Sequence, residues 1–334
     1  MHSVDYQITP DDLDQALRAD VLSGLRSVPK HLPPKWFYDD RGSALFEDIT
    51  QLEEYYLSRA ERELLHWHVD EIARASGAAE LVELGAGAAV KTRLLLDALR
   101  AAGTLRRYTP LDVSGPFLER AAASIATDYP DLDVHAVVAD FHHTPPPSSA
   151  IGTRLFALLG STLGNQTPPQ RHAFLSQLRS ALDDRDRLLL GVDLVKSPER
   201  LVRAYDDASG LTAEFNRNVL HVLNRELGAT FAPAEFAHLA LWDAEAEWVD
   251  IRLRATCAQQ VQIQQLDMAV SFAAGEDLHT EISAKFRPEG LRAELGAAGF
   301  AVADWWSDPV GDFALVLAQP VGPAGDHGVS SSSS

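Results

Sequence analysis

Cysteine is almost missing from this sequence of 334 residues, in which Cys257 is the single one. One cysteine excludes a disulfide bond within the chain, and it leaves no cysteine cluster that could hold a metal ion. We therefore expect neither a disulfide framework nor a bound metal.

Basic residues are few beside acidic ones, at 29 Lys and Arg against 48 Asp and Glu, for a formal net charge of −19. Nucleic acids and anionic membranes are bound through Lys and Arg, so this balance argues against both. No apolar run approaches the ~20 residues of a membrane span, and no secretion signal begins the chain. We expect a cytoplasmic, monomeric enzyme whose low-complexity end, residues 322–334, is a disordered tail.

One stretch organises the chain: a buried strand at 81–84, a turn containing Gly85 and Gly87, and a helix opening near Val90. Glycines without Cβ atoms let a ligand approach the backbone, and a helix N-terminus follows directly. Val90 stands where a dinucleotide fingerprint needs a third small residue, and Glu83 would repel a pyrophosphate. A carboxylate there suits a cationic ligand without phosphate, such as S-adenosyl-L-methionine, although glycine turns without any ligand also exist.

The next strands each end in a polar residue. Residues 107–112 end in Asp112, at the distance from the glycines where an acid binds ribose hydroxyls. Residues 134–141 end in Asp140 and Phe141, which could frame an adenine. Instead of binding a ligand, Asp112 could cap the following helix, and Asp140 could be an ordinary loop residue.

A fourth strand, residues 154–160, is continuously apolar and therefore predicted to be buried on both faces. It leads to Asn165, beyond the carboxyl end of the strand, where ligands bind in open α/β sheets. A turn asparagine beside Gly164 is the alternative. Residues 187–193 predict the fifth strand.

The alternation of strand and helix stops at residues 196–286. Two helices (197–207 and 211–227) and strands at 246–258, 260–270 and 278–286 are predicted, as an inserted substrate domain. Alternation in the last strand puts His279, Glu281, Ser283 and Lys285 on one face, which could bind a polar ligand or be an exposed strand face. A helix (288–300) and two strands (301–307, 312–319) then complete a seven-stranded sheet with a reversed last strand.

In their order along residues 28–320, these motifs resemble those of the histidine Nα-methyltransferases of ergothioneine biosynthesis. The resemblance rests on the following segments: Leu32-Pro-Pro-Lys-Trp-Phe-Tyr-Asp, Glu54-Tyr-Tyr, Glu83-Leu-Gly-Ala-Gly with Lys91-Thr-Arg, Asp140-Phe, Leu159-Gly-Ser-Thr-Leu-Gly-Asn, Leu201-Val-Arg-Ala-Tyr-Asp-Asp, Phe215-Asn-Arg-Asn-Val-Leu and Lys285-Phe-Arg-Pro-Glu.

The resemblance implies a class I, Rossmann-like S-adenosyl-L-methionine-dependent methyltransferase with an added α+β substrate-binding domain. Residues 61–195 and 287–321 would form the core, and residues 8–60 and 196–286 the substrate domain. The reaction implied is trimethylation of the α-amino group of L-histidine to hercynine. The implied cofactor residues are Gly85, Lys91, Asp112, Asp140 and Phe141, beside Glu83 and Gly87 of the glycine turn.

For the substrate, the resemblance implies that Asn165 and Tyr205 hold the amino and carboxylate end, near the Gly160 carbonyl and Tyr38. Further, it implies that the imidazole is bound by Tyr55, Glu281 and Ser283 in a pocket lined by Phe46, Thr212 and Ile251. Ile251 departs from the methionine expected at that position, an apolar change of similar volume.

Three other functions compete with this prediction. A methyltransferase of another amino acid, such as tryptophan, would leave Glu281 and Ser283 without partners. An inactive, regulatory protein that binds the cofactor would not need the substrate residues, which are present. The net charge disfavours a nucleic-acid methyltransferase, and Glu83 and Val90 disfavour a nicotinamide oxidoreductase.

Overall fold

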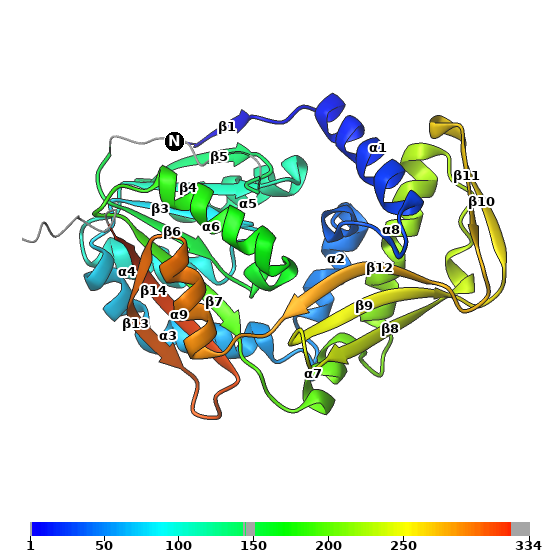
Figure 1. The fold of residues 1–334 in the computed structure, drawn as a ribbon. Helices are drawn as coiled ribbons and strands as arrows, with labels where there is room; N and C mark the ends of the chain where they lie inside the picture. The colour runs from blue at the N-terminus through cyan, green and yellow to red at the C-terminus, as the bar shows by residue number, and fades with distance from the viewer. Residues whose placement is uncertain (1, 143, 145–150, 322–334) are drawn as a thin grey trace, which may run out of the picture.

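The computed structural model describes residues 2–142, 144 and 151–321, so the predicted tail at 322–334 lies outside the described residues. Within them, the central sheet has eight strands in the order β1-β5-β4-β3-β6-β7-β14-β13 (Figure 1). Their bounds are β1 (His2–Tyr6), β3 (Glu80–Leu84), β4 (Arg107–Asp112), β5 (Asp133–Val138), β6 (Arg154–Leu158), β7 (Arg187–Asp193), β13 (Phe300–Ser307) and β14 (Phe313–Pro320).

The predicted seven strands are present, and β14 runs antiparallel to β7 as expected. The strand order reverses at β3, which lies between β4 and β6, and this is the point where open α/β sheets bind ligands. The eighth strand, β1, pairs in parallel with β5 and is not evident in the sequence. It is mostly exposed at the sheet edge, so it lacks the apolar pattern that marks the other strands.

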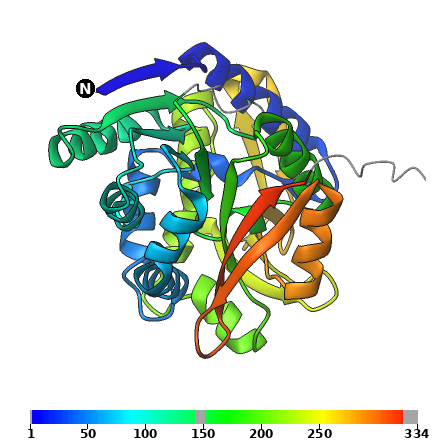
Figure 2. The same ribbon diagram turned by 90° about the vertical axis from the view of Figure 1, so that its left-hand side faces the viewer.

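Helices cover both faces of the sheet because its parallel strands are apolar on both sides (Figure 2). One core joins the sheet to α3 (Leu57–Ser76), α4 (Thr92–Ala101) and α5 (Gly115–Asp128). A second core, on the opposite face, joins it to α6 (Pro168–Ala181) and α9 (Pro288–Ala297). None of the helices in the described residues has the length and apolar character needed to cross a membrane.

The predicted substrate domain is built on a four-stranded sheet in the order β2-β12-β9-β8. These strands are β2 (Lys30–His31), β8 (Phe236–Asp243), β9 (Trp248–Ala255) and β12 (Asp277–Ala284), with a separate hairpin of β10 (Gln259–Ile263) and β11 (Met268–Phe272). The helices beside them are α1 (Pro10–Arg26), α2 (Asp40–Ile49), α7 (Pro198–Tyr205) and α8 (Leu211–Leu227), with 3₁₀ turns η1 (Pro34–Phe37), η2 (Thr162–Asn165), η3 (Pro233–Glu235) and η4 (Gln264–Leu266).

Two expectations for this region are wrong, and one strand was missed. Residues 260–270 are not one strand but parts of the β10–β11 hairpin, because η4 and Asp267, at φ 46°, turn the chain. Strand β8 was not predicted. A bulge in β12 between His279 and Glu281 places these side chains on opposite faces, since His279 pairs with Arg252 and Glu281 with Ile251.

The two sheets meet at η2, which follows β6. A Cβ on Gly164 would stand 2.7 Å from the carbonyl oxygen of Ala284 in β12, so glycine permits this approach. A parallel bridge between Leu194 and Phe286 joins the same two regions. The carboxyl end of β6 is thereby held against the strand that carries Glu281 and Ser283.

Candidate active site

The glycine turn follows β3 with positive φ values at Gly85 (73°) and Gly87 (52°). Asp112, at the end of β4, accepts hydrogen bonds from the N–H of Gly87 at 3.1 Å and from the N–H of Ser114 at 3.0 Å. Ser114 is itself the N-cap residue of α5. Asp112 therefore ties the glycine turn to β4, and the helix-cap alternative does not describe it.

Phe141 and Asp140 lie beside the same turn. The Phe141 ring lies 3.6 Å from the point where a Cβ on Gly85 would stand, so it packs over that glycine. Asp140 accepts a hydrogen bond from the N–H of His142 at 3.1 Å and lies 3.7 Å from the Lys35 ammonium. Phe141 therefore lies against the glycine turn, and the role of Asp140 and Phe141 as an adenine frame stays a prediction.

Glu83 does not have the surroundings that the sequence suggested. Both of its carboxylate oxygens accept from the Thr92 hydroxyl at 2.7 Å, and one accepts from the Tyr108 hydroxyl at 2.5 Å. Burial raises the pKa of Glu83 to about 7, which opposes a fixed negative charge. Glu83 is thus held by Thr92 and Tyr108 beneath the glycine turn, and its role toward a cationic ligand stays a prediction.

Lys91 begins α4 and forms an ion pair with Glu61, a residue that the sequence analysis missed. Glu61 is fully buried, and it accepts a hydrogen bond from the N–H of Gly160 at 2.7 Å. Its carboxylate occupies the space that a side chain on Gly191 would fill. One buried acid therefore links the end of the glycine turn to the end of β6.

Asn165 ends η2 and is partly buried. Its side-chain amide has no hydrogen-bond partner within the part of the chain that the structure describes. An amide left free beyond the carboxyl end of β6 is available to a ligand, and the position of Asn165 in a 3₁₀ turn beside Gly164 also fits the turn alternative.

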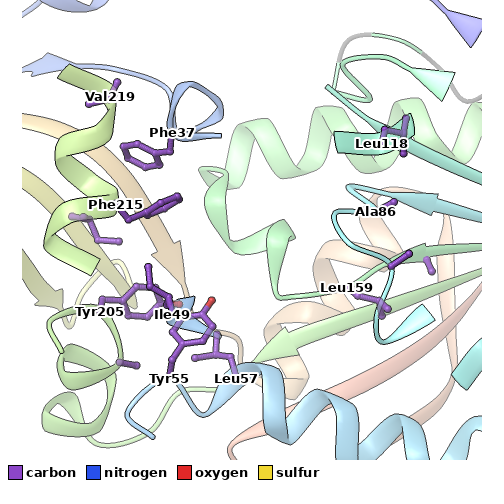
Figure 3. Packing of buried hydrophobic residues seen from close by; sticks show 14 of the residues in the cluster. Phe37, Ile49, Tyr55, Leu57, Ala86, Leu118, Leu159, Tyr205, Phe215 and Val219 are labelled. Atoms are coloured by element: carbon purple, nitrogen blue, oxygen red, sulfur yellow. The ribbon is translucent and has the colours of Figure 1, made fainter. Parts of the chain in front are cut away.

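An aromatic cluster stands opposite the glycine turn (Figure 3). The ring centroids of Tyr55 and Tyr205 are 6.0 Å apart, and those of Phe46 and Tyr55 are 6.1 Å apart. Tyr38 contacts Phe46 at 5.6 Å. Burial, followed by the neighbouring Glu281 carboxyl, raises the pKa of the Tyr38 hydroxyl, so Tyr38 stays protonated and can act as a donor.

Tyr205, Ser283 and Lys285 form a buried polar group. The Tyr205 hydroxyl lies 2.7 Å from the Ser283 hydroxyl, and the Lys285 ammonium donates to both, at 2.8 and 2.7 Å.

The buried Asp193 carboxylate joins this group to two further residues. Lys285 pairs with Asp193 at 2.9 Å. Asp193 accepts from the Tyr56 hydroxyl at 2.9 Å and is paired with Lys196. Sequence reasoning assigned no role to Asp193, which ends a predicted strand, or to Lys196, and it placed Lys285 on one face of the last strand of the insertion without a specific partner.

Glu281 stands next to this group on β12, two residues before Ser283. Its carboxyl has no hydrogen-bond or ion-pair partner among the described residues. Burial raises the pKa of Glu281 to about 7, while Lys285 acts in the opposite direction. Glu281 pairs across the strands with buried Ile251. A partly buried, unpaired carboxyl of this kind is expected at a binding site.

Thr212, the remaining predicted pocket residue, lies in the first turn of α8, where its N–H donates to Asp207 at 2.8 Å. The described residues contain no group of three or more side chains that could hold a metal ion. One side of the site therefore has the glycine turn with the carboxylates of Asp112 and Asp140. The other side has the Ser283 hydroxyl, the Asn165 amide and the Glu281 carboxyl.

The chain is matched over residues 17–320 by the model of a family described as histidine-specific methyltransferase, SAM-dependent. It is 51% identical over 311 residues to the histidine N-alpha-methyltransferase of Mycolicibacterium smegmatis, covering 93% of this chain and 97% of that protein. The enzyme of the same name from Mycobacterium tuberculosis is 52% identical over 305 residues, covering 91% and 94%.

A third relative, ergothioneine biosynthesis protein 1 of Neurospora crassa, is 35% identical over 221 residues, which are 64% of this chain and 25% of that longer protein. The family match, over residues 17–320, includes the glycine turn, β12 and every strand of the two sheets except β1. The protein described here therefore belongs to the S-adenosyl-L-methionine-dependent, histidine-specific methyltransferase family.

Proposed function

We propose that this protein methylates the α-amino nitrogen of L-histidine three times to form hercynine, a step of ergothioneine biosynthesis. The observation that carries the proposal is the unpaired carboxyl of Glu281, two residues from Ser283 on β12. An imidazole ring has one N–H and one lone pair, which match a carboxylate acceptor and a hydroxyl donor. The names of the two mycobacterial relatives support the same substrate.

The methyl donor fits the glycine-turn side of the site. Backbone groups of Gly85 and Gly87 would lie against the amino acid part of S-adenosyl-L-methionine, and Lys91 would meet its carboxylate. Asp112 would accept from the ribose hydroxyls, and Asp140 with Phe141 would frame the adenine. When bound, the cofactor supplies an electrophilic methyl carbon on a sulfonium centre.

The histidine backbone would lie nearer to β6. The Asn165 amide is free to bind the amino or carboxylate group, and the Gly160 carbonyl would accept from the amine. Tyr38 would bind through its protonated hydroxyl. Tyr55, Phe46, Thr212 and Ile251 would enclose the ring. The Tyr205 hydroxyl oxygen would accept from the amino group at the other end of the substrate.

These residues would catalyse the reaction mainly by positioning, because the step is an in-line displacement. The lone pair of the amine forms the new N–C bond while the C–S bond breaks and its electrons stay on sulfur. The amine must first lose a proton, since an α-amine with pKa ~8 is mostly charged at pH 7. Tyr38 is protonated and is not itself the base.

We also propose, from the sequence, that residues 61–195 and 287–321 form the cofactor-binding core and that residues 8–60 and 196–286 form the substrate-binding domain. The proposal further includes a monomer that works in the cytoplasm. Sedimentation equilibrium and cell fractionation test the last two statements.

The test is incubation of the purified protein with S-adenosyl-L-methionine and each of the twenty amino acids, followed by mass spectrometry. A histidine product heavier by three methyl groups supports the proposal. Trimethylation of tryptophan but not of histidine would contradict the assignment of Glu281 and Ser283 to an imidazole ring. It would not affect the assignment of the cofactor site. Cofactor binding without any product contradicts the enzymatic function.

The Glu281→Ala variant examines the ring contact directly. We expect its kcat/KM for histidine to fall by more than tenfold while its Kd for S-adenosyl-L-methionine stays within about twofold. An equal loss in both quantities would mean that Glu281 has a structural role.

A further inference from the structure

The Lys285 ammonium is completely enclosed and has three acceptors for its three N–H groups. These are Asp193 at 2.9 Å, the Tyr205 oxygen at 2.8 Å and the Ser283 oxygen at 2.7 Å. Burial lowers the pKa of Lys285, but Asp193 raises it and thereby favours the charged form. Because all three donors are in use, Lys285 has none left for a substrate.

The protons of the two hydroxyl groups can then be counted. Tyr205 and Ser283 have two hydroxyl protons between them, and one lies in the 2.7 Å contact that joins their oxygens. Lys285 has no acceptor to offer, so the second proton cannot point toward it. Within the described residues, neither hydroxyl has another acceptor. The pair therefore has one donor that is free for a ligand.

The position of Glu281 decides which hydroxyl presents that donor. Glu281 and Ser283 are two residues apart on β12, beyond the bulge, and their strand partners Ile251 and Val249 lie on one face of the sheet. A neutral imidazole could donate its N–H to Glu281 and accept from Ser283. Tyr205 would then donate to Ser283 and serve as a relay.

We propose that Lys285 is a specificity-determining positioning residue: by donating to both hydroxyl oxygens it leaves the Tyr205–Ser283 pair with a single free donor, which Ser283 presents to a ring bound beside Glu281, so that the site selects a ring with an unprotonated nitrogen. The inference rests on the proposed function, since it concerns the same substrate. Without the ammonium, both hydroxyls are free to rotate, and the site no longer offers one fixed donor beside one acceptor. Lys285 needs no contact with the substrate for this effect.

The experiment compares kcat/KM for L-histidine and for L-β-(2-thienyl)alanine, whose five-membered ring has no nitrogen. We expect the ratio of the two values to fall at least about tenfold in Lys285→Met, because a hydrogen-bond match worth ~1.4 kcal/mol is lost. The Kd for S-adenosyl-L-methionine should stay within about twofold. An unchanged ratio would overturn the inference.

Lys196→Met is the matched control, because Lys196 pairs with the same Asp193 but contacts neither Tyr205 nor Ser283 among the described residues. Like Lys285→Met, this substitution removes one positive charge that is paired with the Asp193 carboxylate. We expect its ratio to equal that of the wild type. An equal fall in both variants would assign the effect to the charge balance around Asp193 and would contradict the inference.

Two hydroxyl variants provide a test that does not depend on how Lys285→Met folds. Ser283→Ala should lower the ratio about as much as Lys285→Met, and combining the two should lower it no further, because both act on one donor. Tyr205→Phe should keep the ratio, since Lys285 still donates to the Ser283 oxygen and the Ser283 proton remains free for the ring. A ratio lowered by Tyr205→Phe but not by Ser283→Ala would overturn the assignment of the donor.

A failure of the inference about Lys285 can be told apart from a failure of the proposed function. If the wild-type protein methylates no histidine, the proposed function fails and the ratio has no meaning. If it methylates histidine and the ratio is insensitive to Lys285, only the further inference fails.

Discussion

The fully buried Glu61 carboxylate accepts a hydrogen bond from the Gly160 backbone N–H at 2.7 Å and is paired with Lys91. Glu61→Ala would leave the Gly160 N–H and the Lys91 charge without their partner. We expect a loss of about 3 kcal/mol in the free energy of unfolding, measured with urea. Glu61→Gln should lose less, because its amide oxygen can still accept from Gly160.

Glu80→Gln is the control for this prediction, because Glu80 is also a buried acid but begins β3, at the opposite end of the strand from the glycine turn. It should leave the KM for histidine unchanged. Glu61→Gln, by contrast, should raise the KM for histidine or the Kd for S-adenosyl-L-methionine. If it leaves both unchanged, the contacts of Glu61 with Gly160 and Lys91 do not contribute to ligand binding.

The adjacent tyrosines should respond differently to loss of their hydroxyl groups. Tyr56 donates to buried Asp193 at 2.9 Å, whereas the Tyr55 hydroxyl has no hydrogen-bond partner among the described residues. Tyr56→Phe should lower the free energy of unfolding by about 1.5–3 kcal/mol. Tyr55→Phe should leave it within about 0.5 kcal/mol and raise the KM for histidine. The reverse pattern would exchange the two assigned roles.

Gly164 sets the approach of η2 to β12. In Gly164→Ala, the new Cβ would collide with the Ala284 carbonyl oxygen, at 2.7 Å, so Asn165 and Ser283 should move apart. We expect a loss of 1–3 kcal/mol in stability and a higher KM for histidine. Gly290→Ala, in α9 with open space around the new Cβ, should be neutral or stabilise by about 0.5–1 kcal/mol. Equal effects of both changes would contradict this packing.

Stability should depend on pH through Glu281. Folding raises the pKa of Glu281 from the ordinary value near 4.3 to about 7. The folded protein therefore binds this proton more tightly than the unfolded chain does. The resulting contribution to the free energy of unfolding is fully present below pH ~4.3 and is lost as the pH rises to about 7. Glu281→Gln stays neutral throughout. Relative to the wild type, the variant should therefore gain stability, on the order of 1 kcal/mol, between pH 5 and pH 8.

The measurement is urea unfolding of both proteins at several pH values without ligands. Glu83, whose pKa is also raised to about 7, is common to both proteins and cancels in the difference. A difference that does not vary with pH would show that Glu281 titrates normally in the folded protein.

Much of the site could be predicted from the sequence because it depends on local patterns. Strands β3, β4, β6 and β7 are short apolar runs, and in a parallel sheet their carboxyl ends meet at one edge. Asp112, Asp140 and Asn165 could therefore be placed together before any tertiary contact was known. The resemblance to a family added the substrate residues far along the chain.

Other features depended on contacts between distant segments. The sequence could not show that Glu83 faces Tyr108 and Thr92 inside the core, since burial depends on what packs against the strand. It also could not show the bulge that separates His279 from Glu281, because alternation assumes a regular strand. Strand β1 has no apolar pattern and forms only because β5 offers a free edge.

The sequence by itself determined the alternation of strand and helix from β3 to β7, the glycine turn and the acids that follow it, because short-range periodicity and backbone freedom are encoded residue by residue. Tertiary structure alone decided which charges are paired. Glu61 with Lys91, and Lys285 with Asp193 and Tyr205, come from segments far apart in the chain. Their pairing follows from burial, which requires each charged group to find a partner wherever the fold places one.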